Sequence, residues 1–383
     1  MDKQIYLCLA HMSKAGLEQK YVKEAFDTNW VVPLGPNVNA FEEDLKQFTG
    51  GTHEVVALSA GTAAVHLALI ACGVGPGDEV LVQSFTFCAS SHPITYLGAK
   101  PVFVGSEPET WNMDPVLLEE AIKDRIAKIG KKPKAIVPVA LYGMPYDCKR
   151  IMEIADRYDI PVVEDAAEGF GSKFDGRILG TFGKFGVLSF NGNKMITTSG
   201  GGALVCQSVE DKNTVMWYAT QARDAYPYYQ HTAIGYNYRM SNVVAGVVRG
   251  QFPYLKEHIA QKKAIYERYK EGLKGLPVSM NPMDLENSEP NYWLSCLIIN
   301  KEAMCKQVRG EQDVCYVKET GKSCPTEILE AIASINAEGR PIWKPMHMQP
   351  IYRLNPFVVR DGNGRARSCL LYTSPSPRDP KTS

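Results

Sequence analysis

The sequence predicts an α/β fold: a mostly parallel central sheet covered by helices, followed by a smaller α+β domain. Three observations lead to this prediction. Short apolar segments alternate with helical patterns from Glu54 to Cys206, and this alternation builds βαβ units around a parallel sheet. The chain has 383 residues, 45% of them hydrophobic, which is enough for a large buried core. Near Tyr254 the alternation of strands and helices gives way to a charged helical stretch, which indicates a connection to a second domain.

The expected elements follow one another in a regular order. Apolar runs between turn residues predict the strands, and the longer periodic segments between them predict the helices. The expected strands are 55–58, 79–83, 101–104, 135–141, 161–164, 185–190 and 203–206. The helices between them end near Ala71 and Leu97 or span 115–129 and 147–158. Residues 13–29 are expected to form an amphipathic helix ahead of the first strand.

The same pattern sets the expected domain boundaries. Residues 1–255 are expected to form the large domain, and residues 256–367 a small and apparently truncated one. A polar segment rich in Ser and Pro, residues 368–383, follows. Because such a segment offers little apolar surface for packing, we expect a tail that is either foreign sequence joined to a shortened reading frame or a natural disordered end.

Composition excludes several classes of function. Lys plus Arg and Asp plus Glu both number 42, so the net charge is zero and no surface for nucleic acid or membrane is expected. The sequence has no apolar run of the roughly 18 residues that a spanning helix needs and no signal-peptide pattern, so we expect a cytoplasmic protein. The ten cysteines include no CxxC pair, which argues against a metal site and for reduced thiols.

Lys194 is the first candidate catalytic residue. The apolar strand 185–190 precedes it, and a Gly-rich turn and the strand 203–206 follow it. A lysine held between two strands beside small and hydroxyl residues suits a buried, reactive amine, which can form a Schiff base with a carbonyl once it is desolvated and deprotonated. By itself, the segment more often describes a solvated lysine in a surface turn.

Two further segments change that interpretation. The run 160–169 is a buried-strand pattern that leads to Asp165, and open α/β sheets gather their ligand sites at the C-terminal ends of strands. The run 58–64 is a strand-to-helix turn in which Gly61 and Thr62 can hold a phosphate at a helix N-terminus. Pyridoxal 5′-phosphate needs a Schiff-base lysine and an acid against its pyridinium nitrogen, so the three segments together predict that cofactor. Ordinary helix caps at Asp165 and Thr62 are the alternatives.

These three segments, together with the run 235–242, resemble the DegT-type aminotransferases of nucleotide-sugar biosynthesis. The resemblance covers about residues 5–367 and implies a fold-type I pyridoxal-phosphate enzyme. Within that family, the runs 110–115, 219–224 and 343–350 are similar to the transaminases of the UDP-N-acetylbacillosamine type. Those enzymes aminate a UDP-linked 4-keto-6-deoxy sugar.

The resemblance implies roles for the residues around the cofactor ring. Lys194 is expected to hold pyridoxal 5′-phosphate as a Schiff base and to move the proton during transamination, and Asp165 is expected to face the pyridinium nitrogen. Phe87 matches the position whose ring stacks on the cofactor, although an aromatic residue in such a run is also compatible with core packing. Glu168 stands where many relatives carry Gln against the ring hydroxyl, which alters that hydrogen bond.

At the cofactor phosphate, the resemblance implies residues from two chains. Small residues permit close backbone approach and hydroxyl groups donate hydrogen bonds; the candidates are Gly61, Thr62 and Ser189. Asn237 matches the residue that reaches the phosphate from the neighbouring subunit, which implies a homodimer with shared active sites. A turn asparagine is the alternative for Asn237.

The resemblance also implies the reactants. L-glutamate is expected to give its amino group to the keto carbon of a nucleotide-linked 4-keto-6-deoxy sugar, UDP-2-acetamido-2,6-dideoxy-4-keto-hexose. Arginine suits the anionic groups of both reactants because it forms bidentate hydrogen bonds. The candidates for binding them are Arg223, Arg239, Arg340 and His347. Each is equally compatible with a surface charge or a structural histidine.

Two other functions are compatible with parts of the pattern. One is a pyridoxal-phosphate-dependent sugar dehydratase, but the related dehydratases carry histidine in place of the lysine, so Lys194 argues against it. The other is an inactive homologue with a regulatory role. The complete set of cofactor residues argues against such decay, whereas the lack of the family's closing strand and helix favours an unstable or inactive chain.

Overall fold

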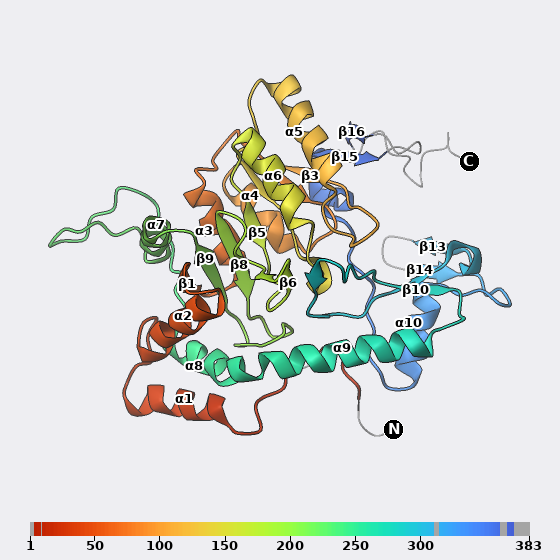
Figure 1. Cartoon of the computed structure of the whole chain (residues 1–383), viewed down its shortest axis with the longest axis horizontal. Coiled ribbons are helices and arrows are strands. Elements are labelled where there is room, and N and C mark those ends of the chain that lie inside the picture. The colour runs from red at the N-terminus through yellow and green to blue at the C-terminus, as the bar shows by residue number, and fades with distance from the viewer. Residues whose placement is uncertain (1–3, 9, 310–313, 361–365, 371–383) are drawn as a thin grey trace.

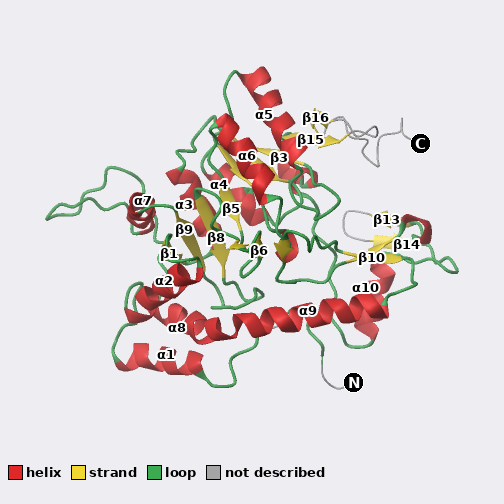
Figure 2. Cartoon of the chain, viewed as in Figure 1, coloured by secondary structure: helices red, strands yellow, loops and turns green. Residues whose placement is uncertain are grey.

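The computed structural model describes residues 4–8, 10–309, 314–360 and 366–370. Figure 1 shows helices on both sides of a central sheet, and a long helix, α9 (Leu255–Gly272), that leads from the sheet to a smaller unit. The same view coloured by secondary structure separates the strands of the sheet from the helices that cover them (Figure 2). The expected α/β class with a mostly parallel sheet is confirmed.

The central sheet joins two sets of described strands. Parallel bridges between Ile136 and Val162 and between Val139 and Asp165 connect the sets. Most of the strands run in one direction, and β9 and β16 run against their neighbours. In spatial order the strands are β1 (Glu54–Leu58), β9 (Gly202–Cys206), β8 (Phe185–Ser189), β5 (Val163–Asp165), β4 (Ala135–Val137), β2 (Glu79–Gln83), β3 (Lys100–Val104), β15 (Pro356–Arg360) and β16 (Ala366–Leu370).

Both faces of the sheet are buried, because successive strand residues alternate between two apolar clusters. Val55 and Ala57 of β1 belong to one cluster, whereas Val56 and Leu58 belong to the other. The first cluster includes residues of α2 (Pro36–Phe48), α5 (Pro115–Ile129), α6 (Cys148–Tyr158) and α8 (Asn242–Gln251). The second includes residues of α3 (Gly61–Ala71), α4 (His92–Tyr96) and α7 (Val209–Ala219).

Local sequence explains where several elements begin and end. The helix expected at 115–129 is α5, whose first N–H groups are capped by the Asp114 side chain and whose end is a left-handed Gly130. The strand expected at 135–141 ends at Val137, because Pro138 has no N–H to donate to a ladder. Ahead of Leu97 the structure has a short 3₁₀ turn and α4 in place of one longer helix. The N-terminal helix, α1 (Leu17–Asp27), is shorter than expected.

In its described residues, the smaller unit at the far end of α9 contains short antiparallel pairs, a 3₁₀ turn at Lys301–Ala303 and one α-helix. Its described elements are β10 (Val278–Met280), β12 (Leu297–Ile299), β13 (Gln307–Arg309), β14 (Val314–Tyr316) and α10 (Pro325–Ser334). Two strand pairings cross the expected domain boundary at residue 256. The first joins β11 (Ser288–Glu289) to the large domain. There β11 pairs with β6 (Lys173–Phe174), which in turn pairs with β7 (Arg177–Ile178).

The second pairing returns β15 to the central sheet. Phe357 and Val358 pair in parallel with Phe103 and Val104 of β3, so one strand of the expected small domain, residues 256–367, belongs to the central sheet. Apolar β15 extends the sheet by one strand, and β16 pairs with it along its whole length, from Ala366 to Leu370. Residues 368–370 of the expected tail therefore lie in a strand, and residues 371–383 lie outside the described residues.

Residues 220–240 form a loop that leaves the body beside α7, and we call it the tyrosine loop (Figure 1). Bridges between Thr220 and Asn237 and between Arg223 and His231 hold its two arms together. Its exposed apolar side chains are Tyr226, Tyr228, Tyr229 and Ile234. Among the described helices, none has the length and apolar character that a membrane span requires.

Candidate active site

Lys194 and Asp165 lie at the C-terminal ends of two neighbouring parallel strands. Asp165 is the last residue of β5, and Lys194 follows β8 in the loop that leads to β9. Backbone bonds from Thr198 N–H to the carbonyl of Phe190, and from Phe190 N–H to Gly201, close this loop at its base. The sheet thus fixes the positions of both residues, as the strand pattern predicts.

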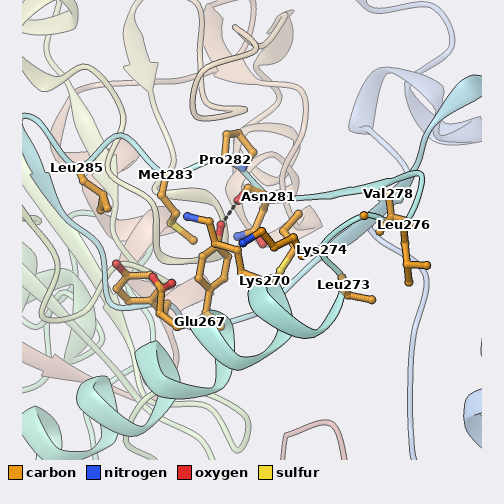
Figure 3. A pocket seen from close by; sticks show the side chains of 14 residues that line it. Glu267, Lys270, Leu273, Lys274, Leu276, Val278, Asn281, Pro282, Met283 and Leu285 are labelled. Atoms are coloured by element: carbon orange, nitrogen blue, oxygen red, sulfur yellow. Dashed lines mark hydrogen bonds between the residues drawn. The ribbon is translucent and has the colours of Figure 1, made fainter.

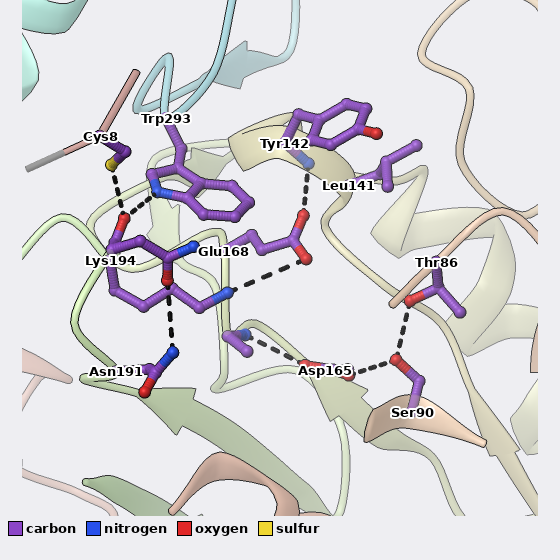
Figure 4. A network of polar contacts seen from close by, with 12 residues as sticks. Cys8, Thr86, Ser90, Leu141, Tyr142, Asp165, Glu168, Asn191, Lys194 and Trp293 are labelled. Carbon is purple, nitrogen blue, oxygen red and sulfur yellow. Dashed lines mark hydrogen bonds and ion pairs between the residues drawn. The ribbon is translucent and has the colours of Figure 1, made fainter. Parts of the chain in front are cut away.

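The side chain of Lys194 is largely buried, with 13% of its surface exposed. Its Nζ lies 3.9 Å from Oε1 of Glu168 and 4.2 Å from the centre of the Trp293 ring (Figure 4). Burial lowers the pKa of Lys194, while the carboxyl groups of Glu168 and Asp165 act in the opposite direction. A buried amine with a lowered pKa is the form that attacks a carbonyl.

Asp165 is buried with its carboxylate held by the protein (Figure 4). The hydroxyl of Ser90 donates to Oδ2 at 2.6 Å, and the Ala167 N–H donates to Oδ1 at 3.1 Å. Burial raises the pKa of Asp165, and these two bonds oppose the rise. A carboxylate in this state fits a cationic N–H partner such as a pyridinium nitrogen. Residues 166–172 form turns, so Asp165 does not cap a helix.

Glu168 completes the group of buried charges around Lys194. Its Oε2 accepts the Tyr142 N–H at 2.7 Å, and its backbone carbonyl accepts a bond from the Asn291 amide at 2.7 Å. Burial raises the pKa of Glu168 to about 7, and Lys194 opposes the rise. Glu168 therefore titrates near neutral pH in direct electrostatic contact with the lysine.

The turn before α3 brings the three phosphate candidates together. A Cβ added to Gly61 would lie 3.0 Å from Cβ of Ser189, so only glycine allows this approach without displacement. The helix begins after Ala60, whose side chain makes no capping bond, and Thr62 lies inside the first turn and is not its cap. Free N–H groups at a helix start beside hydroxyl side chains fit a phosphate.

An aromatic cluster borders the lysine and the two carboxyl groups. Phe87, 52% exposed, lies against Trp343 at 5.5 Å between ring centres, and Tyr142 contacts both Trp343 and Trp293. The Trp293 indole donates to the carbonyl of Asn193 at 2.7 Å, next to Lys194 in the chain. The exposed face of Phe87 remains available for stacking on a planar ligand.

Sequence reasoning missed Tyr142, Trp293 and the Ser90 hydroxyl. Tyr142 has a left-handed backbone with φ 53°, and Tyr292, before Trp293, has φ 56°. Neither conformation has a glycine or asparagine signal in the sequence. The one available signal was Ser90, because hydroxyl residues cluster after a strand in the run 84–91.

The four predicted anion-binding residues do not converge within the chain. Arg239 bonds to Glu42 and to the carbonyl of Ala57, so its guanidinium points toward α2. Arg340 pairs with Glu338. Arg223 lies in the tyrosine loop with its guanidinium 4.1 Å above the Tyr229 ring.

His347 lies beside Ser84, the residue that follows β2. Its Nδ1 is 2.6 Å from the Ser84 hydroxyl, and its ring stacks on Phe357 at 3.7 Å. Burial lowers the pKa of His347 to about 4, so the ring is neutral at pH 7. A neutral ring offers a hydrogen bond to a substrate but no charge.

Asn237 is exposed on the return arm of the tyrosine loop. The next residue, Tyr238, accepts the Ser59 N–H at 2.8 Å, which ties this arm to the end of β1. The structure therefore presents Asn237 to the outside of the chain.

A pocket of about 350 Å³ lies elsewhere, between α9 and β10 (Figure 3). Side chains of Tyr266, Lys270, Met280 and Leu285 are among those that line it, and none of the predicted site residues does. Of the two buried tyrosines that line it, Tyr266 and Tyr292, Tyr266 donates its hydroxyl to the carbonyl of Asn281 at 2.8 Å. The pocket is thus separate from the group of predicted residues at the C-terminal ends of β5 and β8.

In the described residues no group of His, Cys, Asp and Glu could hold a metal ion. The buried lysine, the buried acid and the glycine turn before α3 fit pyridoxal phosphate, the cofactor of fold-type I enzymes. The model of the DegT/DnrJ/EryC1/StrS aminotransferase family matches residues 13–361, and the chain belongs to this family.

Among the proteins that are similar to the chain are three relatives and one solved structure. EpsN of Bacillus subtilis (strain 168), described as a pyridoxal phosphate-dependent aminotransferase, is 43% identical over 95% of this chain and 88% of its own. GDP-perosamine synthase of Escherichia coli O157:H7 is 34% identical over 91% and 87%. UDP-2-acetamido-2-deoxy-3-oxo-D-glucuronate aminotransferase of Pseudomonas aeruginosa is 34% identical over 71% and 73%.

The similar solved structure is a crystal structure of a DegT DnrJ EryC1 StrS aminotransferase from Brucella abortus. It has a TM-score of 0.78 at 27% identity, and the match covers 90% of this chain and 85% of that one. The chain is thus a pyridoxal-phosphate-dependent sugar aminotransferase.

Proposed function

We propose that this aminotransferase moves the amino group of L-glutamate to the keto carbon of a UDP-linked 4-keto-6-deoxy sugar, UDP-2-acetamido-2,6-dideoxy-4-keto-hexose. The observation that supports the catalytic part is the buried Lys194 amine, which lies 3.9 Å from the Glu168 carboxyl group. Lys194 follows β8, and the neighbouring parallel strand β5 ends in a second carboxyl group, that of Asp165. Bound pyridoxal phosphate supplies the carbonyl that takes up the amino group and the ring that accepts electrons.

Three side chains act on the reacting atoms in this proposal. Lys194 holds the cofactor and, once released from it, moves the proton that transamination relocates. Asp165 keeps the ring nitrogen protonated, because its buried negative charge needs a positive partner. Phe87 stacks on the ring, for which its half-exposed side chain is suitably placed.

The phosphate is held by residues of two chains in this proposal. Gly61, Thr62 and Ser189 provide the cradle at the start of α3, and Asn237 of a second copy reaches it from outside. Exposed apolar side chains support the assembly, since such patches mark protein contacts. In addition to the side chains of the tyrosine loop, they include Trp30, Val31, Val32 and Leu34.

The names of relatives and two candidate side chains support a nucleotide sugar as the substrate. A GDP-sugar and a UDP-2-acetamido sugar appear in the names of two similar proteins. We assign Arg223, carried on the exposed tyrosine loop, and the neutral His347 to substrate contacts. Arg239 and Arg340 remain candidates, although both already pair with carboxylates of this chain. A cytoplasmic location is compatible with the described cysteines, which are free thiols.

A 3-keto sugar is the second candidate, because the Pseudomonas aeruginosa relative is named for a 3-oxo substrate. The test is to incubate the enzyme with L-glutamate and matched UDP-, GDP- and dTDP-linked 4-keto and 3-keto sugars, with mass detection of the amino sugar. The proposal requires the fastest turnover with the UDP-linked 4-keto-6-deoxy sugar. Lys194→Ala protein is the blank. Preference for a 3-keto sugar or for another nucleotide would overturn the substrate assignment and leave the reaction type intact.

A further inference from the structure

Glu168 is the buried carboxyl group that lies within ion-pairing distance of the reactive amine. Its Oε1 lies 3.9 Å from Nζ of Lys194, and its Oε2 is fixed by the Tyr142 N–H at 2.7 Å (Figure 4). One oxygen of the carboxyl group is therefore engaged by the backbone, while the other is turned toward the lysine.

We propose that Glu168 is the proton-holding partner of Lys194: its carboxyl group takes the proton that the lysine must lose before the amine can react. The N–H bond of the ammonium breaks, and an O–H bond forms on Oε1. One positive and one negative charge disappear together, so the net charge of the site is unchanged. The inference deepens the proposed role of Lys194 by naming where its proton goes.

The burial of the site favours this exchange. Taking an ammonium and a carboxylate out of water is unfavourable for both ions, whereas a neutral amine and a neutral acid are easily buried. Glu168 is 4% exposed and Lys194 has 13% of its side chain exposed, so both groups lack most of their hydration. The same burial shifts the pKa of Glu168 up, to about 7, and that of Lys194 down.

Other groups around the pair prevent a complete loss of the proton. The Trp293 ring face, 4.2 Å from Nζ, favours the ammonium. Asp165 and the Cys8 thiol also face Lys194 and favour its charged form, while Asp165, Tyr142 and Cys296 interact with Glu168. These opposing influences give a pair that shares one proton.

The present separation is too long for a direct hydrogen bond, which needs about 2.7–2.9 Å between charged nitrogen and oxygen atoms. The lysine side chain has four rotatable carbons, so rotation of its stem closes the gap. Glu168 remains fixed by Tyr142 and by the bond between its carbonyl and Asn291. Lys194 is thus the moving member of the pair and Glu168 the stationary one.

The test uses cofactor-free protein, so it does not depend on turnover or on the identity of the sugar. The rate at which a small acylating reagent labels Lys194 is measured against pH by peptide mass analysis, since only the neutral amine reacts. Two groups that share a proton titrate in two coupled steps. The wild-type profile is therefore expected to rise in two steps.

Glu168→Gln keeps an acceptor for the Tyr142 N–H and removes the proton-holding group. Its profile is expected to collapse to one step, about 1–3 pH units below the upper step of the wild type, because the carboxylate no longer supports the ammonium. Glu168→Asp keeps a carboxyl group and is expected to retain two steps, which covers the case in which the Gln variant does not fold.

Glu164→Gln is the matched control. Glu164 is equally buried with a pKa also raised to about 7, but it bonds to Tyr146 and faces away from Lys194. Its variant should retain both steps. A single step in the wild type, two steps in Glu168→Gln, or one step in Glu164→Gln would each overturn the inference. None of these outcomes bears on whether glutamate and a sugar nucleotide are the substrates.

Discussion

Strand β5 carries two buried carboxyl groups on opposite faces of the sheet, and their surroundings differ. Glu164 faces α6 and the Tyr146 hydroxyl, which donates to it at 2.7 Å, and the Phe182 N–H reaches its other oxygen at 3.3 Å. Asp165, one residue further, faces the opposite side with Ser90 and the lysine. Successive side chains of a strand point to opposite faces of the sheet, so Glu164 and Asp165 lie on different faces.

Burial raises the pKa of both groups, so a shifted pKa alone does not distinguish a structural acid from a functional one. The difference lies in the partners. Fixed protein donors surround Glu164, whereas Asp165 shares its side of the sheet with a buried amine and with the turn at Gly61, where we propose that the phosphate binds. A shifted pKa therefore indicates function only where a reactive group lies within reach of the shifted residue.

The largest effect is expected from Lys194→Ala. Without the amine, no covalent link to pyridoxal phosphate forms, and multiple turnover with glutamate and any keto sugar should fall to the background rate. Borohydride reduction of the wild-type holoenzyme followed by peptide mapping should place the label on Lys194. Lys184→Ala is the control, because Lys184 lies at the other end of β8 and pairs with Asp211. A label on any other lysine contradicts the assignment.

Asp165→Asn comes next. The amide cannot keep the ring nitrogen protonated, so the half-reaction with glutamate, followed by cofactor absorbance in a single turnover, should slow by roughly 10²-fold or more. Glu164→Gln makes the same chemical change on the opposite face of the strand and should leave this rate within a factor of about two or three of the wild type. A near-normal rate in Asp165→Asn would falsify the proposed role.

A third test asks whether a second chain contributes Asn237 to the site that contains Asp165 and Lys194. Asn237→Ala should weaken cofactor retention, and mixing it with Lys194→Ala should restore activity, since one site of the mixed dimer has both residues intact. Lys194→Ala mixed with Asp165→Asn is the negative control. Those two residues lie at the ends of strands in one chain, so no intact site can form. Failure of the first mixture, despite demonstrated subunit exchange, places the whole site within one chain.

The sequence was sufficient for the parts of the molecule that depend on local pattern. Parallel strands bring their C-terminal ends to one edge, so recognising strands before Asp165 and Lys194 was enough to predict that these residues meet. Gly61 was predictable for a similar reason, since a strand-to-helix turn beside another strand leaves no room for a Cβ.

The rest depends on contacts between distant segments. Trp293 reaches the lysine loop across 100 positions of sequence, and the left-handed backbones of Tyr142 and Tyr292 that aim the aromatic cluster have no local signal. The pairing of β15 with β3 joins segments that a domain boundary at residue 256 had separated. Such long-range packing is decided by which surfaces fit together, and periodicity does not encode it.

The smallest effect concerns stability and falls on the other face of β5. The pKa of Glu164 is raised from its usual 4.5 to about 7 in the folded chain. Between these values the unfolded chain loses the proton while the folded chain keeps it. The unfolded state therefore binds fewer protons, and the free energy of unfolding falls as pH rises from about 4.5 through 7. The full cost, present above pH 7, is about 3 kcal/mol for a shift of this size.

Glu164→Gln removes this dependence, because an amide does not titrate. Relative to the wild type, the variant should gain stability steadily from pH 5 to pH 8 in urea unfolding, by up to about 3 kcal/mol. At pH 5 it should be the less stable protein, since its amide cannot accept both the Tyr146 and Phe182 bonds. Glu168 is present in both proteins and cancels from the difference. A stability difference that is constant across this range would mean that Glu164 is ionised at neutral pH, and the contrast between the two faces of β5 would then rest on Asp165 alone.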